Sequence, residues 1–403
     1  MKRNLPILFI LSTLVLDAMG IGLILPVMPD LIADVRGADL SQAAVWGGIM
    51  ATSFAIMQFF FSPAVGNLSD RFGRRTILLI SLAVIAVDYV VMALAQTIWL
   101  LLLGRIVAGL AAATYATATA FIADISPPEQ RAQNFGLIAA SFGIGFVLGP
   151  AAGGLLGEIG PRAPFVAAAA LATINLAIGL LFITESLPKE KRRPFDPARA
   201  NPFGSFKYIG NLPGARRFLT VIFLYDLATY VYPAIWAYFT AAAFGWDTGI
   251  IGASLAVYGI SLAIVQGGLI RVILAYLGER AACFWGMALN VICLTLYGLA
   301  DQSWMIWVLI PFSAIGSVVA PAMTAMLSRA ASDDQQGELQ GLLGSMKALT
   351  MIMSPLIMTQ AFFWFTRDGA AIVLPGAPFL VAAVLMGIGF AVLVSRPGAP
   401  QAT

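Results

Sequence analysis

The chain has 403 residues, of which 60% are hydrophobic and only 11% are charged, and its mean hydropathy is +0.89. Soluble globular domains carry about 25% charged residues, so this composition lies outside the soluble class. The net charge of +3 comes without a basic run between aromatic residues, which argues against nucleic-acid binding. The chain has no histidine, which removes the usual catalytic pairs and the commonest metal ligand. We therefore predict no enzyme, no metal site and no cofactor.

Twelve apolar stretches are long enough to cross a bilayer as helices, since about 20 residues span ~30 Å of hydrocarbon. They cover 5–29, 43–66, 76–95, 98–122, 133–157, 163–184, 217–241, 249–273, 280–299, 302–327, 339–364 and 372–394. The first stretch is longer than the apolar core of a signal peptide and carries Asp17, so we predict that it is retained as a span. The runs are continuous rather than alternating, which argues against membrane strands. The predicted fold class is an all-α integral membrane protein.

Lysine and arginine positions predict the orientation. If the N-terminus is cytoplasmic, 18 of the 23 lysines and arginines fall in cytoplasmic segments, and only Arg36, Arg162 and Arg367 fall outside. This bias predicts that both termini are cytoplasmic in a multi-pass protein of a bacterial inner membrane.

A basic stretch broken by prolines, at 185–216, separates six spans from six. We predict an N-terminal six-helix half over 1–184, a cytoplasmic linker over 185–216 and a C-terminal six-helix half over 217–403. Two such halves, related by pseudo-two-fold symmetry around a midplane site, are the expected architecture of a rocking transporter.

Five charged residues lie inside the predicted spans, namely Asp17, Asp88, Arg105, Asp226 and Lys347. A charge near the bilayer centre costs roughly 2.5–3.5 kcal/mol on insertion scales, so such residues are seldom left without a partner or a role. Arg105 in particular needs a carboxylate or helix carbonyls beside it. The chain is therefore predicted to handle protons or a charged solute. The alternative is that Asp17, Asp88 and Arg105 only tie helices together.

The loop between the second and third spans runs from Gly66 to Arg75 with the sequence GNLSDRFGRR. We expect Gly66 and Gly73 to permit a tight turn and a close approach of helices. Asp70 is expected to accept a hydrogen bond from Arg74 or to cap a helix N-terminus, and so to latch the cytoplasmic ends of the two halves together. The alternative is a solvated loop whose arginines only follow the positive-inside rule.

The fifth span is rich in small residues and contains a proline, with Gly143, Gly145, Gly149, Pro150 and Gly153 as its members. Small residues let helices approach closely, and a proline supplies a kink. Ordinary tight packing is the alternative to a specific function.

Together these motifs resemble those of the major facilitator superfamily. The loop at 66–75 is similar to its signature loop, and Gly104-Arg105 resembles its proton-transfer motif. The fifth span resembles the motif of its antiporters. Further segments, including Leu16-Asp17 and Leu339-Gln-Gly-Leu-Leu343, make the pattern similar to the proton-coupled tetracycline efflux antiporters in particular. The resemblance covers nearly the whole chain and is densest in the first half.

The resemblance implies roles for individual residues. Arg105 would help a buried acid, among Asp17, Asp88 and Asp226, to exchange its proton. The fifth span would seal the pocket and distinguish exchange from co-transport. A cytoplasmic gate is expected from Gly66, Asp70, Arg71, Gly73, Arg74, Arg75, Asp124 and Arg131.

The second half departs from the tetracycline antiporters. They carry an acid in helix nine and a histidine in helix eight, where this chain has Asn290 and Leu262, and neither of these titrates. Asp226 and Lys347, by contrast, are expected at similar depth on neighbouring helices, ~13 Å from the cytoplasmic side. We hypothesise that they form an intramembrane ion pair that lines the cavity and replaces the missing site. A structural tie without a transport role is the alternative.

Aromatic residues in the seventh span lie too deep for an interfacial belt, and they are placed to stack on a flat polycyclic drug. Packing or lipid contact is the alternative. The expected substrate-binding residues are Asp17, Tyr230, Trp236, Gln266, Asn290 and Lys347.

The leading prediction is a secondary active exporter, driven by inward proton flow, that moves an amphipathic, tetracycline-like drug outward by alternating access. The alternative is a transporter of another drug, a siderophore or a sugar-like metabolite that has lost the tetracycline site. The expected partners are the drug, protons and the lipid bilayer, with no nucleic acid and no obligate protein partner. Whether a divalent cation such as magnesium accompanies the drug stays open.

Overall fold

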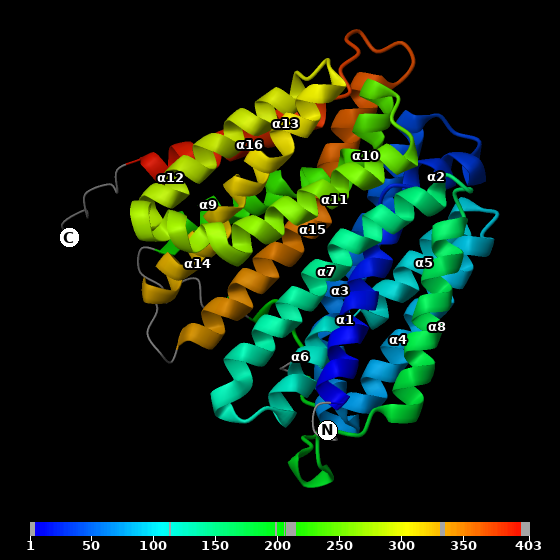
Figure 1. The fold of residues 1–403 in the computed structure, drawn as a ribbon, viewed down its shortest axis with the longest axis vertical. Coiled ribbons are helices and arrows are strands. Elements are labelled where there is room, and N and C mark those ends of the chain that lie inside the picture. The colour runs from blue at the N-terminus through cyan, green and yellow to red at the C-terminus, as the bar shows by residue number, and fades with distance from the viewer. Residues whose placement is uncertain are drawn as a thin grey trace.

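A computed structural model of the protein describes residues 5–112, 114–197, 200–204, 206, 215–330 and 335–395. Within these residues every regular element is a helix (Figure 1). The helices are α1 Leu5–Ile24, α2 Met28–Arg36, α3 Leu40–Phe72, α4 Arg74–Leu94, α5 Ile98–Ala111, α6 Thr114–Ile125, η1 Pro128–Gln130, α7 Arg131–Gly157, α8 Ala163–Phe182, η2 Lys189–Lys191, α9 Ala215–Thr229, α10 Val231–Phe244, α11 Thr248–Ile264, η4 Val265–Leu269, α12 Ile270–Gly298, α13 Ser303–Ile315, η5 Gly316–Val318, α14 Val319–Ala330, α15 Gln336–Thr366 and α16 Ala377–Val394.

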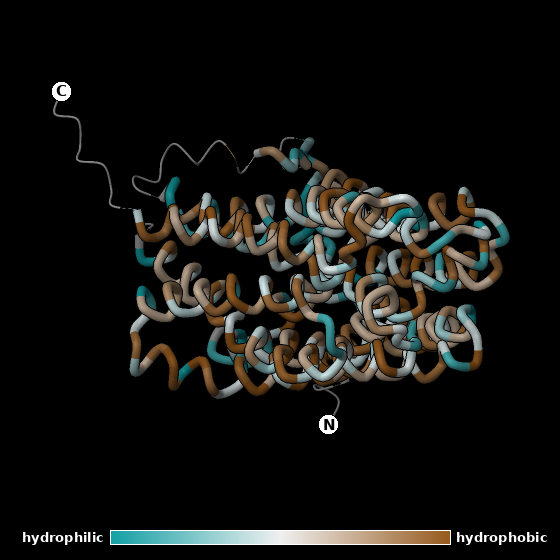
Figure 2. The backbone as a smooth tube through the Cα atoms, turned by 90° about the horizontal axis from the view of Figure 1, so that it is seen from above, coloured by the Kyte–Doolittle hydropathy of each residue, from teal (hydrophilic) through white to brown (hydrophobic). Residues whose placement is uncertain are grey.

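The described helices form twelve membrane spans. Eleven helical stretches are long and apolar enough to cross a membrane, and hydrophobic residues predominate along their length (Figure 2). One of them, Thr248–Gly298, has 51 residues. A straight helix of that length would measure ~77 Å, more than twice the hydrocarbon thickness. Gly278, at φ 70°, breaks this stretch into two spans. The predicted twelve-helix membrane fold is therefore confirmed.

The helices gather into two groups, α1–α8 and α9–α16 (Figure 1). In the first group α1 packs on α7 and α8, while α4 packs on α5 and α8. In the second group α16 packs on α9 and α12, and α11 packs on α13. The groups meet where α7 contacts α11 and where α3 contacts α15. The division of the chain at 184 and 217 stays a prediction, since part of the linker lies outside the described residues.

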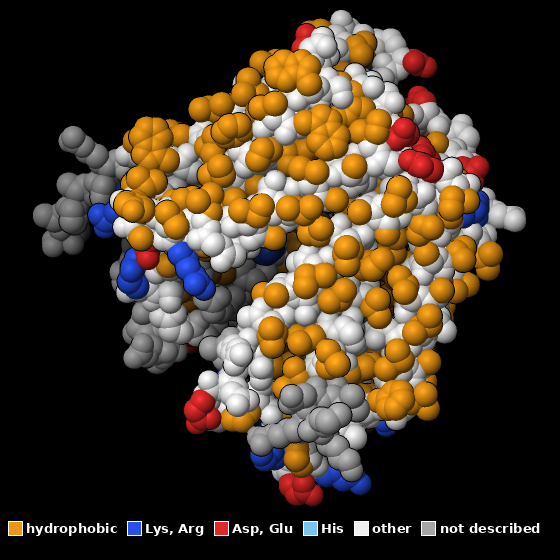
Figure 3. Space-filling model, in the orientation of Figure 1, with side chains coloured by type: hydrophobic (Ala, Val, Ile, Leu, Met, Phe, Trp, Pro, Cys, Tyr) orange, Lys and Arg blue, Asp and Glu red, His pale blue; other side chains and the backbone are white. Residues whose placement is uncertain are grey.

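The contacts between the two halves gather at one end of the molecule. There the Thr248 hydroxyl donates to the Gly154 carbonyl oxygen at 3.2 Å, and the Thr52 hydroxyl donates to the Ile352 carbonyl oxygen at 3.0 Å. We call this the closed end. The opposite end, which holds the α3–α4 turn, is called the linker end. Apolar side chains cover the outer surface, which is hollowed between the halves toward the linker end (Figure 3).

Glycines let α1 and α7 pack backbone to backbone. A Cβ atom on Gly149 would lie 2.5 Å from the Met19 carbonyl oxygen and 2.8 Å from the Gly22 Cα atom. Gly145 and Gly153 face the backbone of α1 in the same way. A Cβ atom on Gly22 would lie 2.5 Å from the Cδ atom of Pro150, so this proline also packs closely on α1. Close packing was predicted for the whole motif, but a Cβ atom on Gly143 would meet open space. Gly143 therefore has no packing role in this structure.

This difference gives a matched pair of variants. Gly149→Ala is expected to lower the free energy of unfolding by about 1–3 kcal/mol, because the extra methyl group overpacks the α1–α7 contact. Gly143→Ala is expected to leave it unchanged or to raise it by up to about 1 kcal/mol, because its Cβ atom has no neighbour within 4 Å and alanine favours a helix over glycine. Thermal unfolding of the purified variants in detergent measures both. Equal destabilisation by the two changes would contradict the packing account.

Candidate functional site

A cavity of about 870 Å³ lies between the two halves. Its lining comes from both, and it includes most of the polar residues predicted from the sequence. Those residues are Asp17, Asp88, Arg105, Tyr230, Trp236, Gln266 and Lys347. Tyr232, one of the aromatic residues predicted in the seventh span, also lines the cavity, as does Gln58, which the sequence analysis did not single out.

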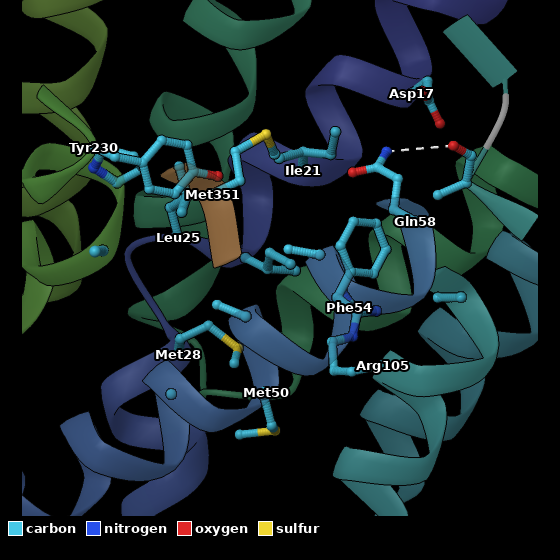
Figure 4. Close-up of a pocket in the computed structure, with 18 of the residues that line it drawn as sticks. Asp17, Ile21, Leu25, Met28, Met50, Phe54, Gln58, Arg105, Tyr230 and Met351 are labelled. Atoms are coloured by element: carbon cyan, nitrogen blue, oxygen red, sulfur yellow. Dashed lines mark hydrogen bonds between the residues drawn. The ribbon is translucent and has the colours of Figure 1, made fainter. Parts of the chain in front are cut away.

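One span is interrupted at the level of this cavity, because it ends as α5 at Ala111 and restarts as α6 at Thr114. The change from α9 to α10 at Tyr230 keeps helical bonding, since the Tyr230 N–H donates to the Asp226 carbonyl oxygen and the Ala234 N–H donates to the Tyr230 carbonyl oxygen. Interrupted helices leave backbone groups without helical partners, and membrane proteins tolerate these where they line a cavity. At the interruption the Gln58 side-chain amide donates to the Ala112 carbonyl oxygen at 3.3 Å (Figure 4). The Thr114 hydroxyl is buried there without a partner among the described residues.

Asp17 on α1 presents its carboxylate to the cavity. Figure 4 shows it pointing toward Gln58 and the carbonyl group that Gln58 contacts. The described hydrogen bonds and ion pairs do not include the Asp17 carboxylate, so the cavity contains an uncompensated acid. An acid in this setting can exchange a proton or bind a cation as the cavity changes its exposure.

Asp88 on α4 forms an ion pair with Arg105 on α5. Both side chains are buried, and the Arg105 guanidinium also lies 5.8 Å from the centre of the Phe54 ring. The predicted need of Arg105 for a carboxylate partner is therefore met by Asp88 rather than by Asp17. A second oxygen of Asp88 has no partner in the described part of the chain, and it faces Gly104.

Asp226 and Lys347 do not form the hypothesised ion pair. No contact between them lies within ion-pair distance in the described structure, although Lys347 is close enough to act on the Asp226 carboxylate through its charge. Asp226 is not among the residues that line the cavity. Lys347 remains exposed to the cavity.

Asn290 does not line the cavity, contrary to its predicted role in substrate binding. Its side chain is buried, and its amide donates to the carbonyl oxygens of Gly286 at 2.9 Å and Gly316 at 3.0 Å. These bonds tie α12 to η5, so the side chain is used in packing. Gln266 lines the cavity from the π-helical turn η4, a feature often found at functional sites.

Trp236 and Tyr230 reach the cavity as predicted. The indole N–H of Trp236 is already bonded, because it donates to the Ser254 hydroxyl at 2.9 Å. Trp236 therefore offers a ring face rather than a hydrogen-bond donor. It belongs to an aromatic group with Tyr232, Tyr297 and Phe379.

The predicted gate lies at the linker end and centres on Arg74. Its guanidinium forms ion pairs with Asp70 at 2.6 Å and with Asp124 at 3.2 Å. The turn from α3 to α4 occurs at Gly73, whose φ of 101° suits glycine. Gly66 was expected to share this turn but lies inside α3, where a Cβ atom would meet nothing within 4 Å. Glycine occurs both in turns and inside helices, so the sequence alone did not show which of Gly66 and Gly73 forms the turn.

The gate joins elements of the first half rather than the two halves. Arg74 connects α3, α4 and the end of α6 through Asp70 and Asp124. Among the described residues the expected latch between the halves is therefore not formed, because the ion pairs of Arg74 both lie within the first half. The other predicted gate residues make local contacts. Arg75 donates to the Leu180 carbonyl oxygen, Arg131 to that of Ser126, and Arg71 lies over the Phe72 ring.

The sequence pattern of the Major Facilitator Superfamily matches residues 10–271. The tetracycline resistance protein of class C from Escherichia coli is 42% identical over 94% of this chain and 96% of its own length. The chain belongs to the Major Facilitator Superfamily. The class G tetracycline resistance protein from Vibrio anguillarum is 39% identical over 86% of this chain and 88% of its length. These relatives confirm the predicted resemblance to the tetracycline efflux group.

A solved structure confirms the superfamily fold. The crystal structure of a bacterial homologue of the human lysosomal transporter Spinster superposes with a TM-score of 0.78. It covers 97% of this chain and 96% of that chain at 17% identity. At this identity the likeness concerns the fold alone.

Glu185 contacts the predicted gate residues, although the sequence analysis did not include it. Its carboxylate accepts from the backbone N–H of Arg74 at 2.9 Å, at the start of α4, where the helix dipole favours an anion. The same carboxylate lies against Gly73 and 3.7 Å from the Arg192 guanidinium. Glu185 is 111 residues from Arg74, and no local spacing in the sequence indicates such a contact.

The two gate glycines provide a second matched comparison. Gly73→Ala is expected to cost about 1–3 kcal/mol, because its backbone conformation is strained for other residues and the methyl group would meet Glu185. Gly66→Ala is expected to be neutral or to stabilise α3 by up to about 1 kcal/mol. Unfolding midpoints and transport rates of both variants test this. If Gly66→Ala were the more damaging change, the assignment of the turn to Gly73 would be wrong.

Proposed function

We propose that this protein is a proton-coupled secondary transporter that exports an amphipathic, tetracycline-like drug by alternating access. The observation that carries the proposal is the unpaired Asp17 carboxylate in a cavity between the two halves. The tetracycline resistance proteins that match nearly the whole chain support the substrate class. The transporter works without a cofactor or catalysis, and one polypeptide is its working unit.

The linker end faces the cytoplasm, with both termini on that side of a bacterial inner membrane. The arginines of the gate and the basic linker support this orientation through the positive-inside rule. With contacts between the halves gathered at the closed end, the cavity is open toward the cytoplasm. This is the state in which an exporter takes up its drug.

Asp17 couples the two substrates because its carboxylate holds either a proton or the cationic part of the drug. Protonation therefore weakens drug binding, and drug binding promotes proton release, by the same factor. The Asp88–Arg105 pair keeps the guanidinium away from Asp17, which leaves that acid available. Asp226 lies outside the cavity lining.

Export from cells tests the proposal. The protein is produced in a tetracycline-sensitive bacterium, and intracellular tetracycline is measured with and without a protonophore. We expect lower accumulation of tetracycline in cells that produce the wild-type protein, and reversal of this difference by the protonophore. Cells that produce Asp17→Asn at the same level should accumulate as much tetracycline as cells without the protein. Unchanged accumulation in producing cells would contradict drug export.

A second candidate is a transporter of another solute. Asn290 and Leu262 favour it, because neither supplies the titratable groups expected at the corresponding places in tetracycline antiporters. The same cells can be screened with other amphipathic drugs, siderophores and sugars. Proton-dependent movement of one of these without tetracycline export would support this candidate.

A further inference from the structure

A second pocket, of about 320 Å³, lies between α4 and α5 in the first half. Its walls are apolar side chains and a glycine, and Asp88 is the one polar residue among the described residues that line it. Val87 and Leu103 belong to these walls and are 61% and 55% exposed, yet neither lines the cavity between the halves. The pocket therefore faces the lipid of the membrane.

Asp88 connects this pocket to the cavity, because it alone among the described residues lines both. Its Oδ2 atom pairs with Arg105, which lines the cavity but not the pocket. Its Oδ1 atom lies beside Gly104, which lines the pocket but not the cavity. The carboxylate thus turns one oxygen to each side.

The Oδ1 atom of Asp88 is an acceptor without a donor. It is buried and has no hydrogen-bond partner in the described part of the chain. Asp88 lies six residues before the end of α4 at Leu94, ~9 Å along the axis, so this oxygen is at the level of the lipid hydrocarbon. Lipid tails donate no hydrogen bond, and a buried acceptor left unpaired costs free energy. A donor group in the pocket would recover this loss.

Gly104 keeps the polar end of the pocket open. A Cβ atom there would lie 2.7 Å from Asp88 Oδ1 and 3.5 Å from Val91 Cγ1, so any other residue would fill the space beside the oxygen. The charge of Asp88 is already balanced by Arg105. An ammonium group would bring an uncompensated charge into the hydrocarbon, whereas a hydroxyl group would not. The site therefore suits a neutral donor.

We propose that this pocket binds an apolar alcohol that enters from the bilayer. The hydroxyl group donates to Asp88 Oδ1, and the hydrocarbon part packs against the valines and leucines of α4 and α5. The bound alcohol and Arg105 then share one carboxylate, which connects the lipid face of the protein with the wall of the cavity. The inference does not depend on which solute the cavity carries.

Binding of a cyclic alcohol to the purified full-length protein tests the inference. Dissociation constants of menthol and of its hydroxyl-free counterpart p-menthane are obtained from the rise of the unfolding midpoint with ligand concentration in the detergent phase. We expect wild type to bind menthol at least about fivefold more tightly, because only menthol can donate to Asp88. Ala83→Phe fills the pocket and should weaken menthol binding at least about tenfold. Ile80→Phe adds the same ring to exposed surface of α4 outside the pocket lining and should bind as wild type does.

Equal affinity of wild type for the two compounds would show that the pocket takes hydrocarbon alone, with Oδ1 held by the Arg105 Nε atom, and would overturn the inference. Menthol binding that survives Ala83→Phe would place the alcohol elsewhere, for example in the cavity that Asp88 also lines, and would overturn it as well. The double variant Asp88→Leu, Arg105→Met removes the acceptor with its partner and decides the matter if Ala83→Phe does not fold. It should bind menthol and p-menthane alike, and a persisting preference for menthol would contradict the role of Asp88.

Discussion

Replacing Asp17 by asparagine is expected to abolish proton-coupled drug transport and to remove the pH dependence of drug binding. Asp17 is the one unpaired acid in the cavity lining of the described structure, and asparagine keeps its size but cannot ionise. In wild type a proton and the drug compete, so drug affinity falls as the pH is lowered, by at most about tenfold per pH unit for one proton. Drug dissociation constants from about pH 6 to about pH 8 measure the effect.

An exposed acid provides the control for this variant. Asp301 lies between α12 and α13 outside the cavity lining, and Asp301→Asn removes the same charge. We expect it to bind and transport as wild type does. A pH dependence that persists in Asp17→Asn would show that another group carries the proton, and the coupling role of Asp17 would be wrong.

Breaking the Asp88–Arg105 pair is expected to destabilise the protein strongly. Asp88→Leu or Arg105→Met alone leaves a buried charge without its partner, which costs about 3–5 kcal/mol. The double variant removes both charges, so most of the lost stability should return. Thermal unfolding of the two single variants and the double variant in detergent gives the coupling between the residues.

The double variant also distinguishes the two roles considered for Arg105, which are assistance in proton exchange and a static tie between helices. If Arg105 assists proton exchange, as its resemblance to the proton-transfer motif predicts, the double variant should fold but transport drug without coupled protons. Wild-type coupling in the double variant would reduce the pair to a static tie between α4 and α5. Additive destabilisation in the double variant would contradict the ion pair itself.

The spans and the depth of the charges could be predicted from the sequence, because both depend on hydrophobic length. The direction in which a side chain leaves its helix could not. Asp226 and Lys347 were placed at similar depth, but only Lys347 is among the residues that line the cavity. Asn290 occupies the expected place along its helix, yet its amide bonds to backbone carbonyl groups.

The helix interruption after Ala111 was not predicted from the sequence. It lies two residues past Gly109, and the change from α9 to α10 at Tyr230 lies three residues before Pro233, whose nitrogen cannot donate a hydrogen bond. Prolines also occur inside the unbroken helices α3, α7 and α15, so such a residue alone does not single out these two places. The break after Ala111 leaves the Ala112 carbonyl oxygen to accept from Gln58.

The most direct test of proton-coupled export uses the purified protein in liposomes, with the linker end outward, an acidic interior and a pH-sensitive dye inside. Tetracycline is added outside, and proton efflux is recorded for wild type and for Asp17→Asn. We predict proton efflux that depends on the drug in wild type and none in Asp17→Asn. Drug uptake without proton movement in wild type, or the same proton efflux in Asp17→Asn, would contradict the account.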